Sequence, residues 1–358
     1  MQINLTAPIN TLSYGYASLN ILKELSKSHQ VSLFPIPHKG AIEVTTQEDL
    51  KVVQQALNNS QFYNKNAPSI RLWHQFDLAQ HAGTPRIGFP IFELDKFNKL
   101  EFHHLSSQDK IFVCSEWAKK VIRENLAENI PTAVVPLGVD SSVFSYNKRE
   151  KNRNMVVLNV GKIEVRKGVD FILDAFNAAF VEKDKVELWM AWANPFLSPE
   201  ETASWEKLYL ESNMGRAGKI KFLPRFSTQQ ELVGVMQAAD VGFFPSRAEG
   251  WNLPALEMLA CGKHIIATDY SAHTEFLSSE NARLISIDSL EPAYDGRWFF
   301  GQGNWAKLGE SQLEQAVSHL RHLYSCFSSS SELINMKGLE TASHFSWANS
   351  ASSLVSHL

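Results

Sequence analysis

The fold is decided by the stretch Val241–Glu275, which reads VGFFPSRAEGWNLPALEMLACGKHIIATDYSAHTE. The pattern predicts a buried strand, a loop, a helix and a second strand, at Val241–Phe244, Arg247–Asn252, Leu253–Cys261 and Lys263–Thr268. Asn252 is a suitable N-cap, Pro254 fits the first helical turn, and Gly262 is typical of a helix end. The stretch is therefore a βαβ unit. In open α/β sheets, ligands bind where such a helix begins, at the carboxyl ends of the strands.

Two carboxylates bracket that helix start. Glu249 lies in the loop and Glu257 lies on the helix, eight positions later. Between them, the backbone N–H groups of Gly250–Asn252 lie at the positive end of the helix dipole. Carboxylates accept hydrogen bonds from sugar hydroxyls and N–H groups hold phosphate oxygens, so the pattern suits a phosphorylated, polyhydroxylated ligand. From spacing alone, an equally good alternative to a ligand site is that Glu249 is a solvated loop residue and Glu257 an acid of the first helical turn.

The segment SRAEGWNLPALEMLACG resembles the glutamate–seven–glutamate motif of the family-four retaining glycosyltransferases, PSxxEGFGLPxLEAMACG. The visible departures are Trp251, where the family usually has Phe, and Asn252, where it usually has Gly. The resemblance implies a donor site for a nucleoside-diphosphate sugar. Its residues here are Glu249, Gly250, Trp251, Asn252, Leu253 and Glu257, with Glu249 acting on the sugar and Glu257 on the ribose.

Length and composition favour a globular protein of two domains. The chain has 358 residues, of which 44% are apolar and 20% charged, and domains commonly hold about 150 residues. The formal net charge of −4 gives no general case for nucleic-acid binding. No run of about 18 apolar residues predicts a spanning helix. Cys114 and Cys261 lie in apolar segments, as buried thiols of a reducing compartment do, and we expect a cytoplasmic protein.

Strands alternate with helices in both halves of the chain, which predicts parallel, doubly wound sheets. The expected strands begin near Ile3, Val31, Ser69, Arg86, Ile111, Ala133, Met155, Val186, Lys219, Val241, Lys263 and Ala282. The polar segment Tyr146–Arg153 is the expected linker. The segment His344–Ala348, HFSWA, resembles the family's FSWxxxA, after which the last helix returns to the first domain. The prediction is an α/β GT-B fold of two Rossmann-like domains facing a central cleft, 1–150 with 342–358 and 153–341.

Clustered cations follow the first strand of the second domain. The segment Asn159–Gly168, NVGKIEVRKG, holds Lys162, Arg166 and Lys167 directly before a helix. Ammonium and guanidinium groups neutralise a diphosphate, although a solvated basic turn has the same composition. The segment resembles the family's VGRLxxxKG, which implies that Lys167 is the diphosphate lysine and a catalytic residue. Lys162 stands where the family usually has Arg, which keeps the charge and loses the bidentate geometry.

A further donor candidate is Arg225. The segment Phe222–Phe226, FLPRF, with Glu231 and the helix to Ala239, resembles the family's FLGxVxxxELxxxYxxAD. In the family, the loop after that strand borders the nucleotide base. Arg225 is suited to stack on a base, and an exposed loop arginine is the alternative.

The amino-terminal half supplies the acceptor-side candidates. The family's Gly-rich loop after the first strand corresponds here to Asn10–Tyr16, NTLSYGY, with Tyr14 and Gly15. Where the family often has a catalytic-site histidine, this chain has FPIFELD, which makes Glu93 the leading candidate to orient acceptor or sugar. His74 and Asp77 follow the preceding strand and are candidates for the same site. For each of these residues, a structural role in a loop or core is the alternative.

No metal site is predicted. The chain contains no pair of aspartates separated by one residue, which the metal-dependent GT-A glycosyltransferases use to hold a divalent ion. Cations and a helix start are expected to hold the diphosphate instead. No cofactor is expected. The co-substrate implied by the resemblance is a UDP- or GDP-sugar.

The leading hypothesis is a retaining, metal-independent glycosyltransferase that moves a hexose to a hydroxyl of a saccharide or glycoconjugate. One alternative is a glycosyltransferase for hydroxymethylated DNA bases, because the amino-terminal pattern is loosely similar to phage-encoded family members. The cations that would meet DNA are Lys96, Lys99, Lys119, Lys120, Arg123, Lys148, Arg149, Lys151 and Arg153. A second alternative is a non-catalytic module that binds nucleotide sugars. The oligomeric state is not predicted.

Overall fold

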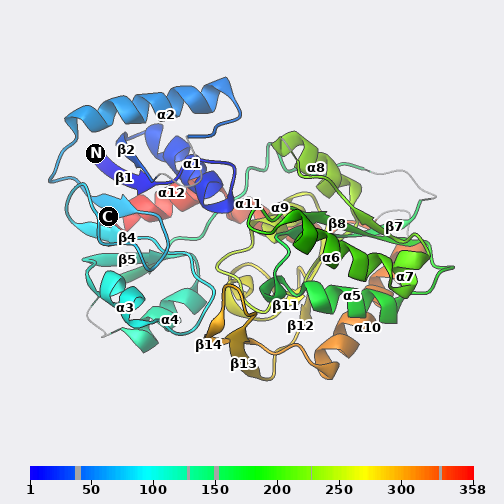
Figure 1. The fold of residues 1–358 in the computed structure, drawn as a ribbon. Coiled ribbons are helices and arrows are strands. Elements are labelled where there is room, and N and C mark those ends of the chain that lie inside the picture. The colour runs from blue at the N-terminus through cyan, green and yellow to red at the C-terminus, as the bar shows by residue number, and fades with distance from the viewer. Residues whose placement is uncertain (37–41, 127–129, 149–152, 227, 330–332) are drawn as a thin grey trace. The chain divides into compact units, whose positions relative to one another are not determined.

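The chain forms two compact units (Figure 1), and the computed structural model describes residues 1–36, 42–126, 130–148, 153–226, 228–329 and 333–358. The first unit is Met1–Gly138 together with Phe345–Leu358, and the second is Val139–His344. The division lies between Gly138 and Val139, ahead of the expected linker Tyr146–Arg153. Residues 149–152 of that linker lie outside the described part of the chain. The last helix, α12 (Trp347–Ser356), belongs to the first unit.

The first unit is built on a six-stranded parallel sheet of strand order β2-β1-β3-β4-β5-β6. Its strands are β1 (Gln2–Ala7), β2 (Gln30–Pro35), β3 (Ser69–Arg71), β4 (Arg86–Gly88), β5 (Lys110–Val113) and β6 (Thr132–Val134). Its helices are α1 (Ser13–Ser26), α2 (Gln47–Asn59), η1 (Ser60–Phe62), α3 (Lys99–Ser106), α4 (Glu116–Asn125) and α12. The predicted doubly wound sheet is therefore confirmed for this unit.

The segment Asn10–Tyr16 is not the open loop that we expected. Helix α1 begins at Ser13, so Tyr14 and Gly15 lie in its first turn. A Cβ at Gly15 would collide with the backbone and the side chain of Asn10, so the glycine allows a close approach of two backbone segments. The prediction of a loop through Tyr16 was wrong because Gly15 serves packing rather than flexibility.

The second unit repeats the design with strand order β12-β11-β10-β7-β8-β9, again with all strands parallel. Its strands are β7 (Met155–Gly161), β8 (Val186–Trp192), β9 (Ile220–Phe222), β10 (Val241–Phe244), β11 (His264–Thr268) and β12 (Arg283–Ile285). Its helical segments are η2 (Val165–Lys167), α5 (Val169–Ala179), α6 (Pro199–Leu210), α7 (Asn213–Arg216), α8 (Gln229–Ala238), α9 (Leu253–Ala260), η3 (Ser271–Glu275), α10 (Glu310–Ser329) and α11 (Met336–His344).

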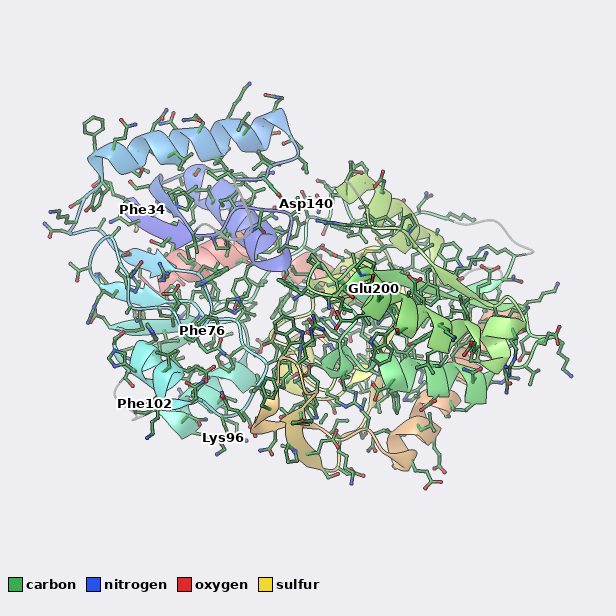
Figure 2. The ribbon with its side chains drawn as sticks, viewed as in Figure 1. Phe34, Phe76, Lys96, Phe102, Asp140 and Glu200 are labelled. Carbon is green, nitrogen blue, oxygen red and sulfur yellow. The ribbon has the colours of Figure 1, made fainter. Side chains whose placement is uncertain are left out.

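Continuous burial of the central strands explains why this sheet is parallel. All four residues of β10 are buried, because helices cover both faces of such a sheet and leave no polar face along the strand. Helix α5 buries Val169, Ile172 and Phe176 on one face, at the spacing of one helical stripe. These side chains join a core cluster with β7, β8 and α10. Exposed side chains such as Phe76 and Phe102 in the first unit and Glu200 on α6 lie outside the cores (Figure 2).

Helix α3 and a two-stranded ribbon are among the elements that were not predicted from the sequence. Helix α3 begins with a capping box, in which Asn98 and Glu101 exchange hydrogen bonds with each other's backbone N–H groups. That signal was present in the sequence and was overlooked. After β12, a two-stranded antiparallel ribbon forms from β13 (Leu290–Tyr294) and β14 (Phe300–Ala306). Strand β13 is mostly exposed, and β14 passes from exposed to buried residues along its length, so neither strand shows the usual alternation of buried and exposed residues.

Candidate active site

The candidate donor site lies where the strand order of the second sheet reverses. The chain runs from β7 outward through β8 and β9, then returns to the other side of β7 with β10. The segments that follow β7 and β10 therefore meet at the carboxyl ends of two neighbouring strands, where open α/β sheets bind ligands. Gly168 allows this approach. It has a φ of +70°, and a Cβ there would collide with the carbonyl oxygen of Pro245.

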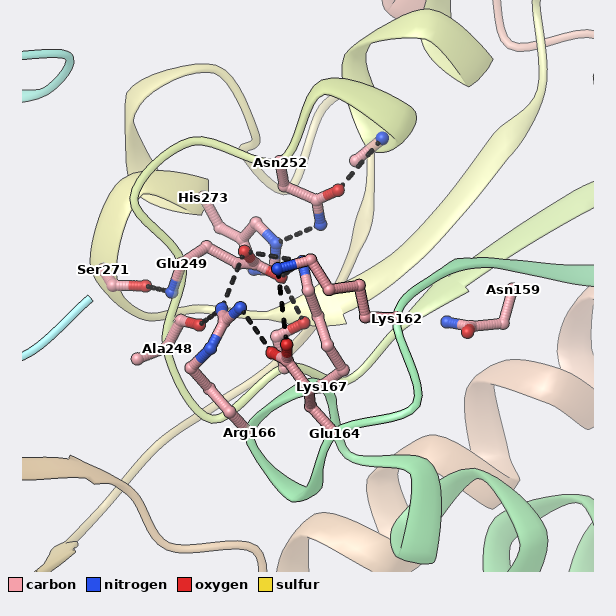
Figure 3. A network of polar contacts seen from close by, with 12 residues as sticks. Asn159, Lys162, Glu164, Arg166, Lys167, Ala248, Glu249, Asn252, Ser271 and His273 are labelled. Carbon is pink, nitrogen blue, oxygen red and sulfur yellow. Dashed lines mark hydrogen bonds and ion pairs between the residues drawn. The ribbon is translucent and has the colours of Figure 1, made fainter. Parts of the chain in front are cut away.

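Glu249 is the centre of the polar network at this position (Figure 3). Its carboxylate accepts hydrogen bonds from Lys167 Nζ at 2.6 and 2.9 Å, from Arg166 Nη1 at 3.1 Å and from Ser246 Oγ at 2.7 Å. Its backbone N–H donates to Ser271 Oγ at 2.8 Å. The side chain is thus held by the cations of η2 and by Ser246, and the backbone is held by Ser271, so the position of Glu249 is determined by the protein.

The surroundings keep Glu249 ionised. Burial alone would raise the pKa of its carboxyl group, since the residue is only 3% exposed. The positive charges of Lys167 and Arg166 oppose this effect, and the pKa falls to about 2. The carboxylate is therefore negatively charged at neutral pH and acts as a hydrogen-bond acceptor.

The three cations after β7 have different surroundings. Arg166 is buried and donates to the carbonyl oxygen of Ala248 at 2.7 Å, to Glu249 and to Glu164 at 2.9 Å. Its donors are thus directed at the protein, and we infer that it orients the loop rather than a diphosphate. Lys162 Nζ lies 3.5 Å from Glu164, and 38% of the Lys162 side chain is exposed. The Lys167 side chain is 18% exposed and that of Arg166 6%, so Lys162 is the most exposed of the three cations.

The backbone conformation of Asn252 explains why asparagine can stand where the family motif usually has glycine. Its backbone is left-handed, with a φ of +84°, and Asn is one of the few residues besides Gly that tolerate this conformation. The side-chain oxygen accepts from the N–H of Ala255 at 3.3 Å, which caps helix α9. The predicted N-cap is therefore confirmed.

His273 fixes the other end of the Asn252 amide. Its Nδ1 lies 3.0 Å from the carbonyl oxygen of Thr268, which only accepts, so Nδ1 carries the proton. Its Nε2 then accepts from Asn252 Nδ2 at 2.8 Å. Burial lowers the pKa of His273, which favours this neutral form. The pair holds the left-handed turn that begins α9.

The backbone at the start of α9 presents hydrogen-bond donors. Gly250, Asn252 and Leu253 are buried, and their backbone N–H groups donate to no other residue in the described part of the chain. Buried N–H groups without a partner are costly, so this arrangement favours an anionic ligand. Trp251 is a packing residue by contrast: it is 3% exposed and its ring lies 5.1 Å from that of Phe276.

Glu257 differs from Glu249 in its electrostatic surroundings. It is 4% exposed, and its carboxyl group forms no ion pair or hydrogen bond with any residue that the structure describes. Burial raises the pKa of this group to about 8. The carboxyl group of Glu257 is thus largely protonated at neutral pH, and none of the described residues uses its hydrogen-bonding capacity. Arg225, the other donor candidate, is exposed on the segment after β9.

The first unit brings three of its four polar acceptor-side candidates together. The ring of His74 lies 4.7 Å from that of Tyr14 and stacks on Phe76 at 5.1 Å. The Tyr14 hydroxyl donates to the carbonyl oxygen of Ile91 at 2.5 Å. Burial, and next to it the charge of Glu93, raise the pKa of Tyr14, so the phenol stays protonated. Asp77 is instead paired with buried Arg71 at 2.8 Å, which gives it a structural role.

Several residues of the donor site were missed from the sequence. Glu164, Ser246, Ser271 and His273 each bond to a predicted site residue. Ser246, Ser271 and His273 all lie within the stretch that decides the fold, yet their residue types are common and carry no spacing signal. Only their tertiary contacts distinguish them.

Two further observations concern metals and membranes. No group of three or more His, Cys, Asp or Glu side chains within the described ranges is arranged to hold a metal ion. Of the helices that the structure describes, none combines the length and apolar character needed to cross a bilayer.

Comparison with known proteins supports the assignment of the second unit. Residues 154–293 match the family described as Glycosyl transferases group 1. This part of the chain is thus similar to group 1 glycosyltransferase domains. It contains β7 through most of β13, and so holds every donor-site residue described above.

Relatives of this domain are named as glycosyltransferases. A mannosyltransferase of Mycolicibacterium hassiacum, "MMP alpha-(1->4)-mannosyltransferase", is 31% identical over 51% of this chain and 43% of its own length. The D-inositol 3-phosphate glycosyltransferase of Geodermatophilus obscurus is 29% identical over 42% of this chain and 35% of its length. The chain thus spans less than half of these two relatives. A protein of Sulfolobus islandicus filamentous virus with the name "Putative glycosyltransferase 45" is 23% identical over 77% of the chain and 71% of its length.

Solved structures extend the likeness beyond the group 1 domain. Sucrose-phosphate synthase of Thermosynechococcus elongatus superposes with a TM-score of 0.71 at 15% identity, over 100% of this chain and 98% of that protein. Anabaena HepE in complex with UDP-glucose gives a TM-score of 0.67 at 15% identity, with 100% of both chains covered. These are GT-B proteins, and two parallel Rossmann-like units confirm the GT-B fold for this chain.

None of the relatives and structures named above is titled as acting on DNA. Several of the cations expected to face DNA are instead paired with acids: Lys119 with Glu116, Lys120 with Glu124 and Arg153 with Asp240. Arg149 and Lys151 lie outside the described residues.

Proposed function

We propose that the chain is a retaining glycosyltransferase that moves a hexose from a UDP- or GDP-sugar to an acceptor hydroxyl, without a metal ion. The acceptor we propose is a saccharide or a glycoconjugate. The names of the relatives favour an enzyme over a binding module, although those relatives are longer than the matched region. The candidate donor-site residues, all within the segment that matches the group 1 family, support a nucleoside-diphosphate sugar as the co-substrate.

One observation carries the proposal, namely the different states of the two glutamates at the start of α9. Glu249 is ionised and held by Lys167, whereas Glu257 is buried and has no protein partner among the described residues. Such a pair suits a ligand with a phosphate and two sets of hydroxyl groups. Glu257 would accept from the ribose, Glu249 from the transferred sugar, and Lys167 with the N–H groups of Gly250 and Leu253 would hold the diphosphate.

The chemistry that these residues support needs no strong protein base. The acceptor oxygen attacks the anomeric carbon on the face from which the diphosphate leaves, and the bond between that carbon and the diphosphate oxygen breaks. The leaving oxygen takes the acceptor's proton. Lys167 stabilises the negative charge that develops on the diphosphate in the transition state. A fixed cation contributes most to the rate at that point. Glu93 is our proposed acceptor-orienting residue in the first unit.

A donor screen tests the proposal. The full chain would be incubated with UDP-glucose, UDP-galactose, UDP-N-acetylglucosamine and GDP-mannose, with manno- and gluco-oligosaccharides as acceptors. Two quantities would be measured, the release of nucleoside diphosphate and the mass of the glycan product. Nuclear magnetic resonance would give the anomeric configuration of the product. We expect one donor to be used and its configuration to be kept.

A matched pair provides the control. Lys221 and Glu187 form an ion pair of 2.7 Å in the same unit, away from the start of α9. Glu249→Gln should abolish transfer, whereas Glu187→Gln should retain it. Inverted product, or equal loss in both variants, would contradict the proposal.

A further inference from the structure

The ribbon β13–β14 is the part of the second unit that the donor site does not use. Tyr294 and Phe300 lie opposite each other in its register. Both are exposed, at 63% and 68%, and their ring centres are 6.4 Å apart in an edge-to-face arrangement. Trp298, in the connecting turn, is 47% exposed. Three exposed aromatic side chains within seven residues are unusual for a surface without a ligand.

The base of the ribbon is fastened to the loop that carries Glu249. The N–H of Ala306 donates to the carbonyl oxygen of Arg247 at 2.9 Å, and Arg247 Nε lies 3.4 Å from Glu291 Oε1. Arg247 also pairs with Asp170 at the start of α5, at 2.7 and 2.8 Å. One buried arginine thus joins the ribbon, the Glu249 loop and α5, so the ribbon has a fixed position beside the donor site.

The turn of the ribbon is fastened to the segments after β7 and β8. Asp295 Oδ1 accepts from the backbone N–H groups of three successive residues, Arg297, Trp298 and Phe299. The ring of Trp298 lies 5.6 Å from that of Phe196, and Lys162 Nζ lies 5.2 Å from the centre of the Phe196 ring. A single aromatic ring therefore separates Trp298 from a cation of the donor site.

We propose that the outer face of the ribbon, Tyr294 with Phe300, binds a sugar ring of a saccharide acceptor. A sugar ring has polar edges and an apolar face of C–H groups, and an exposed aromatic ring such as that of Tyr294 or Phe300 offers a complementary flat face. The charged groups of the turn are directed elsewhere: Asp295 caps the turn and Arg297 pairs with Glu201 on α6. The two exposed aromatic residues of the strands, Tyr294 and Phe300, carry no charge, which favours a neutral saccharide over an anionic polymer.

The attachment of the ribbon to the donor-site segments favours a saccharide over other partners. Both ends of the ribbon are fixed to segments that carry donor-site residues, so a saccharide bound here is close to the group 1 domain's own ligand. The inference rests on the proposed function in one respect, because it takes the bound saccharide to be the acceptor.

The test is a double variant of the full chain, Tyr294→Ala with Phe300→Ala. Neither side chain is buried or belongs to the donor set, so the fold and the binding of UDP or GDP by calorimetry should not change. Native gels containing soluble mannan or dextran provide the probe. We expect at least one polysaccharide to retard the wild-type chain, and the double variant to bind it about tenfold more weakly. Phe62→Ala, an aromatic residue 84% exposed in the first unit, is the matched control and should be retarded like wild type.

Three results would overturn the proposal: a wild-type chain that neither polysaccharide retards, a double variant retarded as strongly as wild type, or equal weakening by Phe62→Ala. Sedimentation with vesicles of phosphatidylethanolamine and phosphatidylglycerol that depends on Tyr294 and Phe300 would also overturn it, in favour of a membrane surface. A chain that binds mannan through the ribbon but turns over no nucleotide sugar would support saccharide binding by the ribbon and would contradict the proposed function.

Discussion

The ammonium group of Lys167 lies 2.6 Å from one carboxylate oxygen of Glu249 and 2.9 Å from the other, although 82 positions separate the two residues in sequence. The contact neutralises both charges while no ligand is bound. A diphosphate that binds here competes with Glu249 for Lys167, and a sugar hydroxyl offers Glu249 a new donor in exchange. The diphosphate and the sugar of the donor would thus be recognised together, by the rearrangement of one ion pair.

The first prediction concerns Lys167. Lys167→Met should lower kcat by roughly 10²–10³, because a fixed cation on the leaving group contributes about 3–4 kcal/mol in a closed site. Steady-state rates of nucleoside diphosphate release measure the effect. Lys221→Met removes the matched lysine of the Lys221–Glu187 pair and should leave kcat unchanged. An unchanged kcat in Lys167→Met would show that the diphosphate does not reach this lysine.

The second prediction separates the two glutamates by their affinity for the bare nucleotide. UDP and GDP contain the ribose but no transferred sugar. Glu257→Gln should therefore weaken nucleoside diphosphate binding by about tenfold or more, as expected for a lost hydrogen bond to a charged group. Glu249→Gln should not weaken it, since the change frees Lys167 from its carboxylate partner. Calorimetry with the variants decides. Equal weakening in both would mean that the assigned roles are wrong even though the fold is right.

The third prediction concerns the left-handed cap. Asn252→Gly and Asn252→Ala both remove the amide that caps α9 and pairs with His273, so both should lower the free energy of unfolding. The alanine variant should be less stable than the glycine variant by about 1 kcal/mol, because glycine adopts a φ of +84° without strain and alanine does not. Urea unfolding measures both. Similar stabilities for the glycine and alanine variants would argue that the left-handed backbone conformation imposes no strain on alanine.

The sheets and the donor motif were predictable because their signals are local. The apolar run Val241–Phe244 predicts a fully buried strand, and Asn252, Pro254 and Gly262 mark the bounds of the next helix. Each signal depends on neighbours within a few positions, so it survives without tertiary information. The structure has a strand at Val241–Phe244 and a helix that ends one residue before the predicted end.

The polar network was not predictable, because its partners are far apart along the chain. His273 contacts Asn252 from 21 positions away, and Arg166 reaches the carbonyl oxygen of Ala248 across 82 positions. Sequence reasoning assigned Arg166 to the diphosphate on its charge alone, whereas burial directs its donors at the protein. The ribbon β13–β14 was missed for a different reason, since its exposed aromatic residues do not follow a core pattern.

The fourth prediction is that activity survives metal chelation. Lys162, Lys167 and the N–H groups at the start of α9 supply the positive charge that a divalent ion would otherwise supply. Turnover with and without EDTA should agree within the error of the assay. Complete loss of turnover that added Mg²⁺ or Mn²⁺ restores would contradict this view of the site.

The fifth prediction uses the protonation of Glu257. Burial raises the pKa of its carboxyl group from 4.5 to about 8. Between these pH values the folded chain holds a proton that the unfolded chain has lost, so this group makes the free energy of unfolding fall as pH rises. Glu257→Gln carries a neutral amide and should lack this contribution. Urea unfolding of both chains between about pH 5 and pH 9 measures the difference.

The same group links protons to ligand binding. Ribose hydroxyls donate hydrogen bonds, and an ionised carboxylate accepts them better than a carboxylic acid does, so bound nucleotide should lower the pKa of Glu257. Binding of UDP or GDP near neutral pH should then release a proton, which calorimetry in buffers of different ionisation enthalpy detects. The nucleotide's own phosphates also titrate, so the comparison with Glu257→Gln isolates the glutamate. Glu310→Gln, at an exposed acid that begins α10, should release protons as wild type does. Equal release in wild type and Glu257→Gln would show that the ribose does not meet this carboxylate.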